Sequence, residues 1–289
     1  MTKVNEMVWL NGQICAATDV IWSLDDRGLS LGDGLFETLQ IRNGAARLFA
    51  SHWQRLQASA YALGFGELGA SEPASNAIAQ CAKLCGITHG SARILLSRGA
   101  GPRGLGFNAE MQTQMLIRVF APSPPSNQPL RLALSTVRRH LSNPSCQHKT
   151  ISHIDMLLSR QMQHEGATGN ESLLLDTRGK VSSAGCGNLF WIKGRNIYTP
   201  SLGCAILPGT TRARVLEFAS ELGFFIYEGA YWPAVLATSE AVFISNAILG
   251  LRAIHVVDLG GGNVSTYPQN HPVLLRLQQF EQAMDSANL

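Results

Sequence analysis

The 289-residue sequence has few charged residues and no marked excess of either sign. Charged residues make up 15% of it, and the formal net charge of +3 is spread along the chain. This pattern gives no argument for nucleic acid or an anionic membrane as a partner. No apolar run approaches the roughly 20 residues of a membrane-spanning helix, and the N-terminus lacks the basic start and apolar core of a signal peptide. We therefore expect a cytoplasmic protein.

The sequence also lacks a convincing metal or nucleotide motif. Its six cysteines are scattered, which in a long chain without an export signal indicates reduced thiols. Cys81 and Cys85 have the spacing of a metal pair on a helix, but no second pair or nearby histidine completes a site, so we interpret them as core thiols and expect no metal. Neither a Walker loop nor a GxGxxG turn is present.

Proline is concentrated in one stretch, which we interpret as the boundary between two domains. Ala121–Pro129 contains four prolines in nine residues, a composition typical of a linker. A chain of this length with 45% hydrophobic residues can bury two modest cores. We predict an N-terminal α/β domain over residues 1–120, a linker over 121–129 and a C-terminal α/β domain over 130–289.

Apolar residues at helical spacing predict two helices beside candidate site residues. The first, over about 50–63, buries the stripe Trp53, Leu56, Ala60 and Leu63. Arg55 lies on this helix but off the stripe, so it is either a surface charge or a residue that reaches into a site. The second helix, over about 152–165, has an inner face formed by Ile154, Leu157, Leu158 and Met162.

The stretch Ile206–Arg212, with the sequence ILPGTTR, runs directly into a third amphipathic helix. The apolar face of that helix is formed by Val215, Phe218, Ala219 and Leu222. The start of the helix presents unpaired backbone N–H groups and a positive dipole end, with the hydroxyls of Thr210 and Thr211 beside them. This arrangement suits a phosphate. An ordinary capped helix start is the simpler alternative.

Two loops carry further polar candidates. Ser97–Gly104 holds Arg98 and Arg103 among glycines, which suits an anionic group close to the backbone. The alternative is that both arginines are charged loop residues without a role in binding. Ser245–Ala247 puts small polar groups at the end of a buried strand that begins near residue 241.

Six motifs, in this order along the chain, resemble the class IV pyridoxal-phosphate enzymes. They are Gly32–Thr38 (GDGLFET), His52–Arg55 (HWQR), Lys149, Asn188–Trp191 (NLFW), Leu207–Arg212 (LPGTTR) and Ser245–Ala247 (SNA). The family contains branched-chain and D-amino-acid aminotransferases and the aminodeoxychorismate lyases. Within it the chain is most similar to the lyases, because Lys149–Asp155 aligns with their lysine segment without gaps and Ser97–Gly104 resembles their Ser-Arg-Gly loop.

The resemblance implies a fold and an activity. The fold class is α/β (α+β), with two domains in the fold-type IV arrangement, pyridoxal phosphate between them, and normally a homodimer. The activity is conversion of 4-amino-4-deoxychorismate to 4-aminobenzoate and pyruvate, which feeds folate synthesis. An aminotransferase of the same fold is the first alternative, and a cofactor-independent or non-catalytic relative is the second.

The resemblance also assigns roles to individual residues. Lys149 would form the Schiff base with pyridoxal phosphate and then act as acid and base on the α-proton. The cofactor phosphate would be bound by Arg55, Thr210, Thr211, Ser245, Asn246 and Ala247. Thr38 matches a threonine that helps to protonate the departing enol in the lyases, where branched-chain aminotransferases have glycine. A threonine is also simply a good strand former. Arg98 and Arg103 are candidates for binding substrate carboxylates.

One position departs from the family pattern. The family has a glutamate five residues before the asparagine that matches Asn188, placed to hydrogen-bond the pyridine nitrogen, and this chain has Ser183 there. A carboxylate keeps that nitrogen protonated, whereas serine offers only a neutral hydrogen bond. The ring would be a poorer electron sink, which should impair transamination more than elimination. The same change could instead mark a protein without the family activity. Gln40, where many relatives have a basic residue, is a smaller departure.

Overall fold

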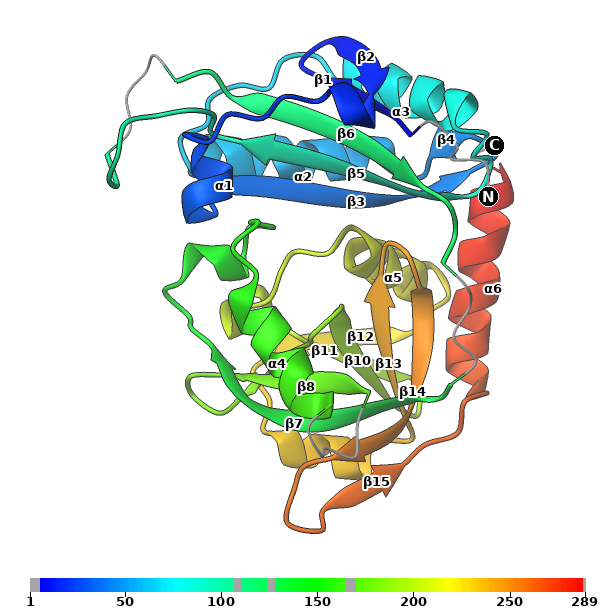
Figure 1. Cartoon of the computed structure of the whole chain (residues 1–289). Coiled ribbons are helices and arrows are strands. Elements are labelled where there is room, and N and C mark those ends of the chain that lie inside the picture. Colours follow the sequence, from blue (N-terminus) through cyan, green and yellow to red (C-terminus); the bar gives the residue numbers. More distant parts are fainter. Residues whose placement is uncertain (1–5, 107–110, 124–127, 165–169, 288–289) are drawn as a thin grey trace. The chain divides into compact units, whose positions relative to one another are not determined.

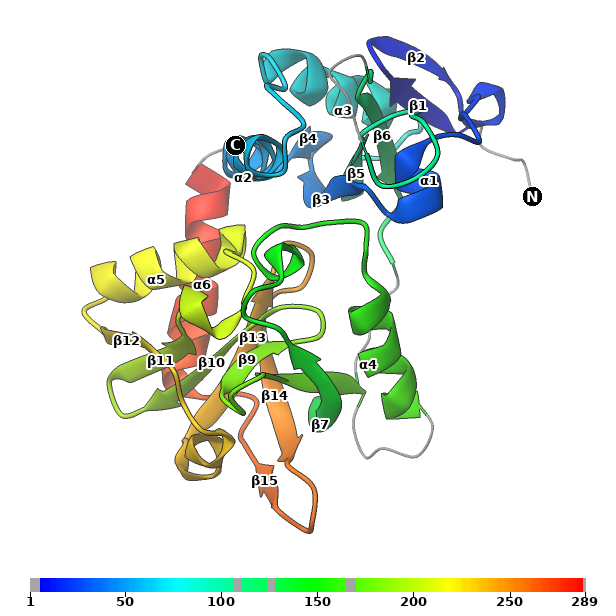
Figure 2. The same ribbon diagram turned by 90° about the vertical axis from the view of Figure 1, so that its left-hand side faces the viewer.

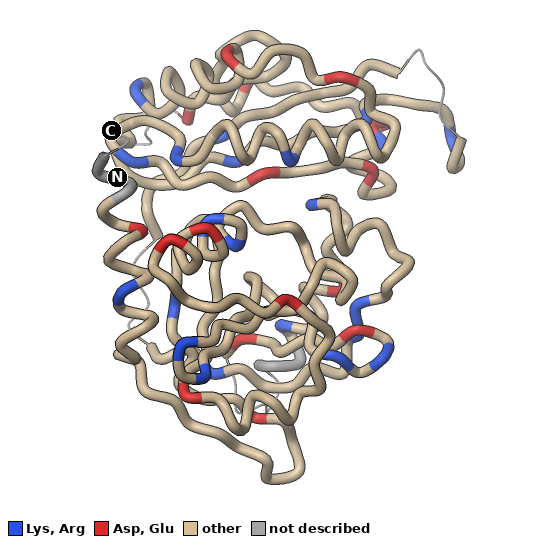
Figure 3. The backbone as a smooth tube through the Cα atoms, turned by 180° about the vertical axis from the view of Figure 1, so that it is seen from behind, with Lys and Arg blue, Asp and Glu red and all other residues tan. Residues whose placement is uncertain are grey.

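The structure, a computed structural model, describes residues 6–106, 111–123, 128–164 and 170–287 (Figure 1). The chain divides into two compact units. Unit 1 comprises Met1–Pro125 and His148–Ser152, and unit 2 comprises Ser126–Gln147 and His153–Leu289. Charges of both signs are scattered over both units (Figure 3). In the ranges that the structure describes, no helix is long and apolar enough to cross a bilayer.

Unit 1 is built on an antiparallel six-stranded sheet with the strand order β2-β1-β6-β5-β3-β4. The strands are β1 (Met7–Leu10), β2 (Gln13–Ala16), β3 (Gly34–Arg42), β4 (Ala45–Ala46), β5 (Gly90–Ser97) and β6 (Gln114–Phe120). The helices are η1 (Ala17–Asp19), α1 (Arg27–Leu31), α2 (Phe49–Ala62) and α3 (Glu72–Leu84).

The core of unit 1 lies between this sheet and helices α2 and α3. Strand β3 alternates, so that Leu35, Leu39 and Ile41 are buried in the core while the residues between them, Glu37 excepted, face the other side. The helix predicted over about 50–63 is confirmed as α2, and its predicted stripe lies inside, with Trp53 and Leu56 buried. The sheet thereby offers one covered face and one face that carries polar side chains.

Unit 2 contains a nine-stranded sheet with the order β12-β11-β10-β13-β14-β7-β8-β9, and β15 pairs with β14. Its strands are β7 (Leu130–Arg139), β8 (Glu171–Asp176), β9 (Val181–Ala184), β10 (Asn188–Lys193), β11 (Asn196–Pro200), β12 (Phe225–Gly229), β13 (Ala241–Asn246), β14 (Gly250–Asp258) and β15 (Val264–Thr266). Its helices are η2 (Pro144–Cys146), α4 (Ile154–His164), η3 (Leu202–Cys204), α5 (Thr210–Glu221), η4 (Pro233–Thr238) and α6 (Pro272–Ala287).

Strands β10 and β13 lie at the centre of this sheet and are buried on both faces. Phe190 and Phe243 stack at 4.9 Å between ring centroids in the cluster that α5 and α6 cover (Figure 2). Leu189 and Ile244 belong to the cluster on the opposite face. Burial on both faces explains the nearly continuous apolar runs of these strands. The predicted helix after Ile206–Arg212 is confirmed as α5, with its apolar face in the core.

Two sequence-based assignments differ from the structure. The helix predicted over about 152–165 exists as α4, but its supposed inner face is wrong: Ile154 and Leu157 are each 64% exposed and Leu158 is 45% exposed. Ser159 is fully buried instead, and its carbonyl accepts a hydrogen bond from Ser172 on β8. A helical period shows that an apolar face exists but not which neighbour it meets. The side chain of Met162 lies outside the described residues.

The second difference concerns His148–Ser152, which the sequence assigned to the C-terminal domain and which packs with unit 1. The Phe36 N–H donates to the Lys149 carbonyl at 2.8 Å, and the Ile151 N–H donates to the Gly34 carbonyl at 3.0 Å. These backbone bonds add the segment to β3 as a short extra strand. Lys149 is therefore positioned by unit 1.

Candidate active site

Lys149 lies on the edge of β3 opposite β5. Its neighbour Thr150 forms a bridge with Leu35, and the Nδ1 atom of His148 lies 3.0 Å from the Ser59 hydroxyl of α2. The Lys149 Nζ atom lies 4.3 Å from the centroid of the Phe36 ring. The lysine is thus fixed by backbone pairing and by contact of its amine with an aromatic face.

The surroundings of Lys149 make its amine a better nucleophile near neutral pH. Burial lowers the pKa of Lys149 from 10.5 to about 8, and the guanidinium groups of Arg55 and Arg93 act in the same direction. The carboxylate of Glu37 opposes them and raises the pKa. A lysine in this range can gain and lose a proton at physiological pH, as a catalytic amine must.

Arg55 projects from α2 onto Glu37 of β3. Its Nε donates to Oε1 of Glu37 at 2.8 Å, and its NH2 donates to Oε2 at 2.6 Å. The Nδ1 atom of His52 lies 2.7 Å from the same Oε2. Burial would raise the pKa of Glu37, but the hydrogen bonds with His52 and Arg55 outweigh it and lower the pKa. Glu37 is therefore ionised in the interior of unit 1.

Thr38 lies on the face of β3 that also carries Phe36 and Gln40. Its register partner on β5 is Arg93, whose Cζ atom is 5.0 Å from the centroid of the Phe36 ring. Since the Lys149 amine also contacts the Phe36 ring, Lys149 and Arg93 lie against one aromatic side chain on the face of β3 that carries Thr38. In the part of the chain that the structure describes, the buried Oε1 of Gln40 has no hydrogen-bond partner.

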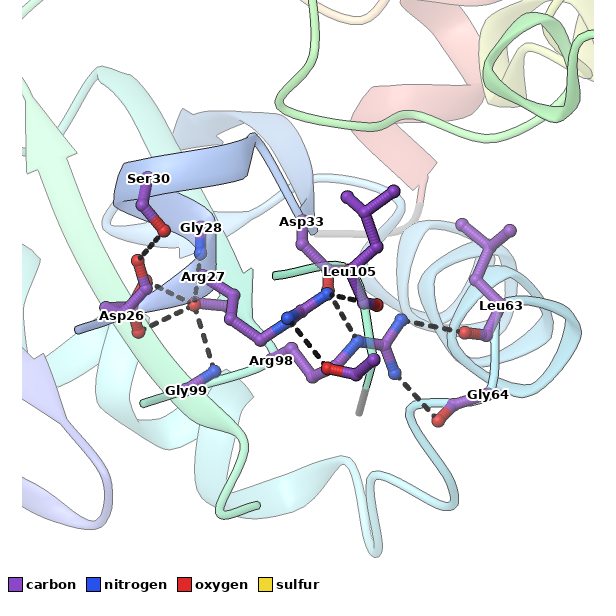
Figure 4. A network of polar contacts seen from close by, with 12 residues as sticks. Asp26, Arg27, Gly28, Ser30, Asp33, Leu63, Gly64, Arg98, Gly99 and Leu105 are labelled. Atoms are coloured by element: carbon purple, nitrogen blue, oxygen red, sulfur yellow. Dashed lines mark hydrogen bonds and ion pairs between the residues drawn. The ribbon is translucent and has the colours of Figure 1, made fainter. Parts of the chain in front are cut away.

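The side chain of Arg98 is engaged inside unit 1 (Figure 4), and its role in substrate binding stays a prediction. Its Nε donates to Asp33 at 2.8 Å, NH1 donates to the Gly64 carbonyl at 2.9 Å, and NH2 donates to the Leu63 carbonyl at 2.9 Å. Its Cζ also lies 4.0 Å from the centroid of the Phe65 ring, and the residue is 7% exposed. A guanidinium bound in this way holds the residues that follow α2.

The loop that carries Arg103 is held by Arg27 instead. The Nε of Arg27 donates to Asp33 at 2.9 Å, and its NH1 and NH2 donate to the carbonyls of Gly104, Leu105 and Gly106. Asp33 thereby joins the Arg27 and Arg98 side chains (Figure 4). Arg103 itself is exposed, and its role in substrate binding stays a prediction.

In unit 2 the N-terminal end of α5, called its entrance below, has features that suit an anion. The helix begins at Thr210, its N-cap is Gly209 without a side-chain cap, and its first turn carries no acidic residue. Thr210 and Thr211 are 8% and 3% exposed. N–H groups at the start of a helix of this length favour a negatively charged group.

Asn188 joins the entrance of α5 to the end of β13. Its Nδ2 donates to the Leu207 carbonyl at 2.9 Å, and a Cβ atom at Gly209 would overlap its Oδ1. In the pairing of β10 with β13, Asn188 stands opposite Ser245. The start of the helix and the loop after β13 are therefore neighbours, and the glycine of the LPGTT motif is required by this close approach.

The end of β13 carries one buried hydroxyl. Ser245 is 1% exposed, and its Oγ has no hydrogen-bond partner within the described ranges. The side chain of Asn246 is engaged within unit 2: Nδ2 donates to the Cys186 carbonyl, and Oδ1 accepts from the N–H groups of Ile248 and Leu249. The predicted role of Asn246 in cofactor binding is therefore proposed below for its backbone. Ala247 follows it in the same turn.

Ser183 lies on β9 and is partly buried. Its neighbour Ser182 is fully buried and donates to the Ala205 carbonyl at 3.3 Å. Residue 205 precedes the stretch that leads into α5, so β9 and the entrance of that helix are tied together.

Sequence reasoning assigned no role to Glu37 or Asn188, although both stand in the motifs. A signal for Glu37 was present, because a charged residue occupies an inward position in the alternating strand Leu35–Ile41. No comparable signal exists for Asn188, whose importance depends on the contact between β10 and the loop before α5.

Each unit combines helices with a sheet; unit 1 carries a partly buried lysine, and unit 2 carries a helix start whose N–H groups suit an anion. The chain belongs to the amino-transferase class IV family, whose model matches residues 34–257. Members of this family are pyridoxal-phosphate enzymes.

Individual relatives carry two different activities in their names. The chain is 28% identical over 247 residues to aminodeoxychorismate lyase of Bacillus subtilis, covering 84% of each. It is 25% identical over 276 residues to D-alanine aminotransferase of Bacillus licheniformis, covering 91% of this chain and 96% of that protein.

The solved structures divide in the same way. The 4-amino-4-deoxychorismate lyase of Pseudomonas aeruginosa has a TM-score of 0.82 and 26% identity, covering 96% of this chain and 98% of that one. The branched-chain amino acid aminotransferase of Escherichia coli has a TM-score of 0.87 at 21% identity, covering 95% and 93%. The fold-type IV architecture is therefore confirmed, but fold similarity does not separate the two reactions.

The position of Lys149 predicts an unusual pH dependence of its reactivity. With an amine-acylating reagent at limiting concentration, labelling of Lys149 in the cofactor-free protein should reach half its maximum near pH 8, because its pKa is lowered to about 8 and only the neutral amine reacts. Mass spectrometry of digests from pH 6 to 11 measures this, with the exposed Lys193 as internal reference. Identical profiles for both lysines would contradict the prediction.

Proposed function

We propose that this protein is a pyridoxal-phosphate-dependent lyase that converts 4-amino-4-deoxychorismate to 4-aminobenzoate and pyruvate in folate biosynthesis. The observation that carries the proposal is the position of Thr38, on the face of β3 where the Lys149 amine contacts the Phe36 ring. A hydroxyl near the catalytic amine suits protonation of a leaving enol. The similarity to the Bacillus subtilis lyase over 84% of the chain supports the same reaction.

The residues present fit pyridoxal phosphate. Lys149 has the buried amine with a lowered pKa that would hold the aldehyde end of the cofactor. The unpartnered Ser245 hydroxyl, together with the entrance of α5, suits a phosphate. The proposed ligands of the phosphate are Arg55, Thr210, Thr211, Ser245 and the backbone of Asn246 and Ala247. When bound, the cofactor supplies the aldehyde that takes up the substrate amine and the ring that accepts electrons as the α-proton leaves.

The protein's own groups then move two protons. The Lys149 amine accepts the proton from the carbon that bears the substrate nitrogen, for which a pKa of about 8 is well placed. Loss of this proton accompanies cleavage of the carbon–oxygen bond to the enolpyruvyl group, and the six-membered ring becomes aromatic. The Thr38 hydroxyl assists transfer of a proton to the departing enol, which becomes pyruvate. Protons and electrons balance without an oxidant.

Ser183 fits an elimination better than a transamination. We assign it to the ring nitrogen of the cofactor, where a neutral hydrogen bond leaves the ring less electron-withdrawing than a carboxylate would. An aminotransferase needs a long-lived carbanion, whereas formation of an aromatic product drives the lyase reaction forward.

An aminotransferase of the same fold is the second candidate. It is favoured by the relation to the Bacillus licheniformis D-alanine aminotransferase over 91% of this chain. This candidate requires a half-reaction with an α-keto acid. A cofactor-independent or non-catalytic protein, motivated by Ser183, would instead be colourless when purified.

We also propose that the protein acts in the cytoplasm as a homodimer, with a small molecule as its substrate and neither nucleic acid nor membrane as a partner. The exposed apolar side chains Ile154, Leu157 and Leu158 of α4 support an interface with a second copy.

The first test is an absorbance titration with pyridoxal phosphate, followed by borohydride reduction and peptide mapping. We expect a near-visible band and a reduced cofactor attached to Lys149, after which 4-aminobenzoate formation is assayed directly. Lys149→Ala should lose the band and the labelled peptide. A wild-type protein without band or label would overturn the proposal of a pyridoxal-phosphate enzyme.

Replacement of Thr38 tests the lyase assignment. Thr38→Val keeps the shape and strand preference but removes the hydroxyl, so kcat for 4-aminobenzoate formation should fall by about 100-fold. Cofactor affinity should not change, because Thr38 is not among the proposed cofactor ligands. Thr38→Ser, the matched control, should keep most of the activity. Wild-type turnover by Thr38→Val would exclude this role of the hydroxyl.

Ser183→Glu tests the role of the ring-nitrogen partner. A carboxylate at position 183 should favour the protonated ring and add transaminase activity, measured as α-keto acid formation from added amino acids. Ser183→Ala removes the hydroxyl without adding charge and should not gain this activity. An unchanged reaction profile in Ser183→Glu would count against tuning of Ser183 for elimination.

A further inference from the structure

Strand β3 carries a carboxylate at a position where the rest of the strand is apolar. Leu35, Leu39 and Ile41 point into the core of unit 1 at the spacing of two residues, and Glu37 occupies the same row. Glu37 is 1% exposed, as fully buried as the leucines on either side. A leucine at this position would be buried without removing a charged group from water.

The partners of Glu37 come from one helix. Arg55 contacts both carboxylate oxygens, at 2.8 and 2.6 Å, and the Nδ1 of His52 lies 2.7 Å from Oε2. His52 and Arg55 are three positions apart on α2, so their side chains emerge on the same side of the helix. The two-point contact fixes the plane of the Arg55 guanidinium as well as its position.

Stability alone is a weak reason for such a cluster. A buried ion pair seldom stabilises a fold more than apolar side chains of similar volume, because desolvation of the two charges offsets their attraction. Removal of one partner is destabilising, but replacement of both often is not. The cluster is therefore better explained by what Arg55 and Lys149 require than by the folding of β3.

We propose that Glu37 is a positioning residue that holds Arg55 in one orientation for the cofactor phosphate and supplies negative charge to the surroundings of Lys149, whose carbonyl is bonded by the N–H of the adjacent Phe36. This inference rests on the proposed function, which assigns Arg55 and Lys149 to the cofactor. A free arginine side chain loses rotamer freedom when it binds an anion. An arginine already held by Glu37 has lost that freedom on folding, so binding of the phosphate is more favourable.

The second part of the role is electrostatic. The charged groups of unit 1 that act on the Lys149 amine are Glu37 from β3, Arg55 from α2 and Arg93 from β5. Burial and the two guanidinium groups disfavour the protonated amine, and Glu37 is the group that favours it. Glu37 thereby keeps the amine able to carry the proton that it takes from the substrate.

Glu37→Gln tests the inference, because it keeps the size of the side chain and removes the charge. We expect the Kd for pyridoxal phosphate, measured by absorbance titration, to rise about tenfold, since Arg55 is no longer held before binding. In the cofactor-free protein, the half-maximal acylation of Lys149 should shift to lower pH, because the negative charge that raises its pKa is gone.

Asp33→Asn is the matched control. Asp33 is also an acid of unit 1 that pairs with two arginines, Arg27 and Arg98, but neither is a proposed cofactor ligand. It should lower the melting temperature while the Kd and the Lys149 profile stay within about twofold of wild type, because the charged groups that act on the Lys149 amine are Glu37, Arg55 and Arg93 rather than Asp33. If Glu37→Gln acted only through a general loss of stability, Asp33→Asn would change the Kd and the Lys149 acylation profile in the same way.

Glu37→Asp separates position from charge and serves if Glu37→Gln does not fold. The shorter side chain keeps the negative charge but cannot keep both contacts with Arg55, so the Kd should rise while the Lys149 profile stays near wild type. A folded Glu37→Gln or Glu37→Asp protein with wild-type Kd would overturn the positioning role. If wild-type protein binds no cofactor at Lys149, the proposed function fails first, and the Lys149 acylation profile of Glu37→Gln still decides the electrostatic part.

Discussion

The backbone pairing of residues 149–151 with the edge of β3 is the interaction on which the candidate site in unit 1 depends. It takes a lysine that lies far along the sequence and fixes it beside Phe36. A Cβ atom at Gly34 would lie 2.7 Å from the Ile151 side chain and 2.5 Å from the Leu96 carbonyl, so only glycine allows this approach. The glycines of the GDGLFET motif therefore allow the segment that carries Lys149 to approach β3, although they are more than a hundred residues from it in the sequence.

A second constraint operates in unit 2, where Asn188 connects three segments. Strand β10 is buried on both faces, so its first residue is held firmly by the sheet. From that position the Asn188 side chain contacts the loop before α5 and stands opposite Ser245. A rigid central strand thus sets the position of both a helix start and a turn, as a binding site needs. The proposed phosphate ligands of unit 2 therefore depend on this strand for their positions.

Much of this could be predicted from the sequence, where periodicity and motif order were informative. The helices α2 and α5, their buried faces and the fold class follow from apolar spacing and from the six motifs. The environment of α4 did not follow, because Ile154, Leu157 and Leu158 show an apolar face whose neighbours are set by tertiary structure. The contacts of Arg98 could not be predicted for a similar reason: its acceptors are the Leu63 and Gly64 carbonyls and Asp33, which only the folded chain brings together.

The choice between elimination and transamination depends on a few side chains in a shared fold. A TM-score of 0.87 with an aminotransferase and 0.82 with a lyase shows that one fold is shared by proteins named for both reactions. Two features of this chain support the lyase proposal: Thr38, for which we propose proton transfer to the departing enol, and Ser183, which we propose stands at the ring nitrogen in place of a carboxylate. Each residue alone has an ordinary structural explanation. With both proposed roles, the demand on the cofactor would fall and the supply of protons to the leaving group would rise, which is the combination that an elimination requires.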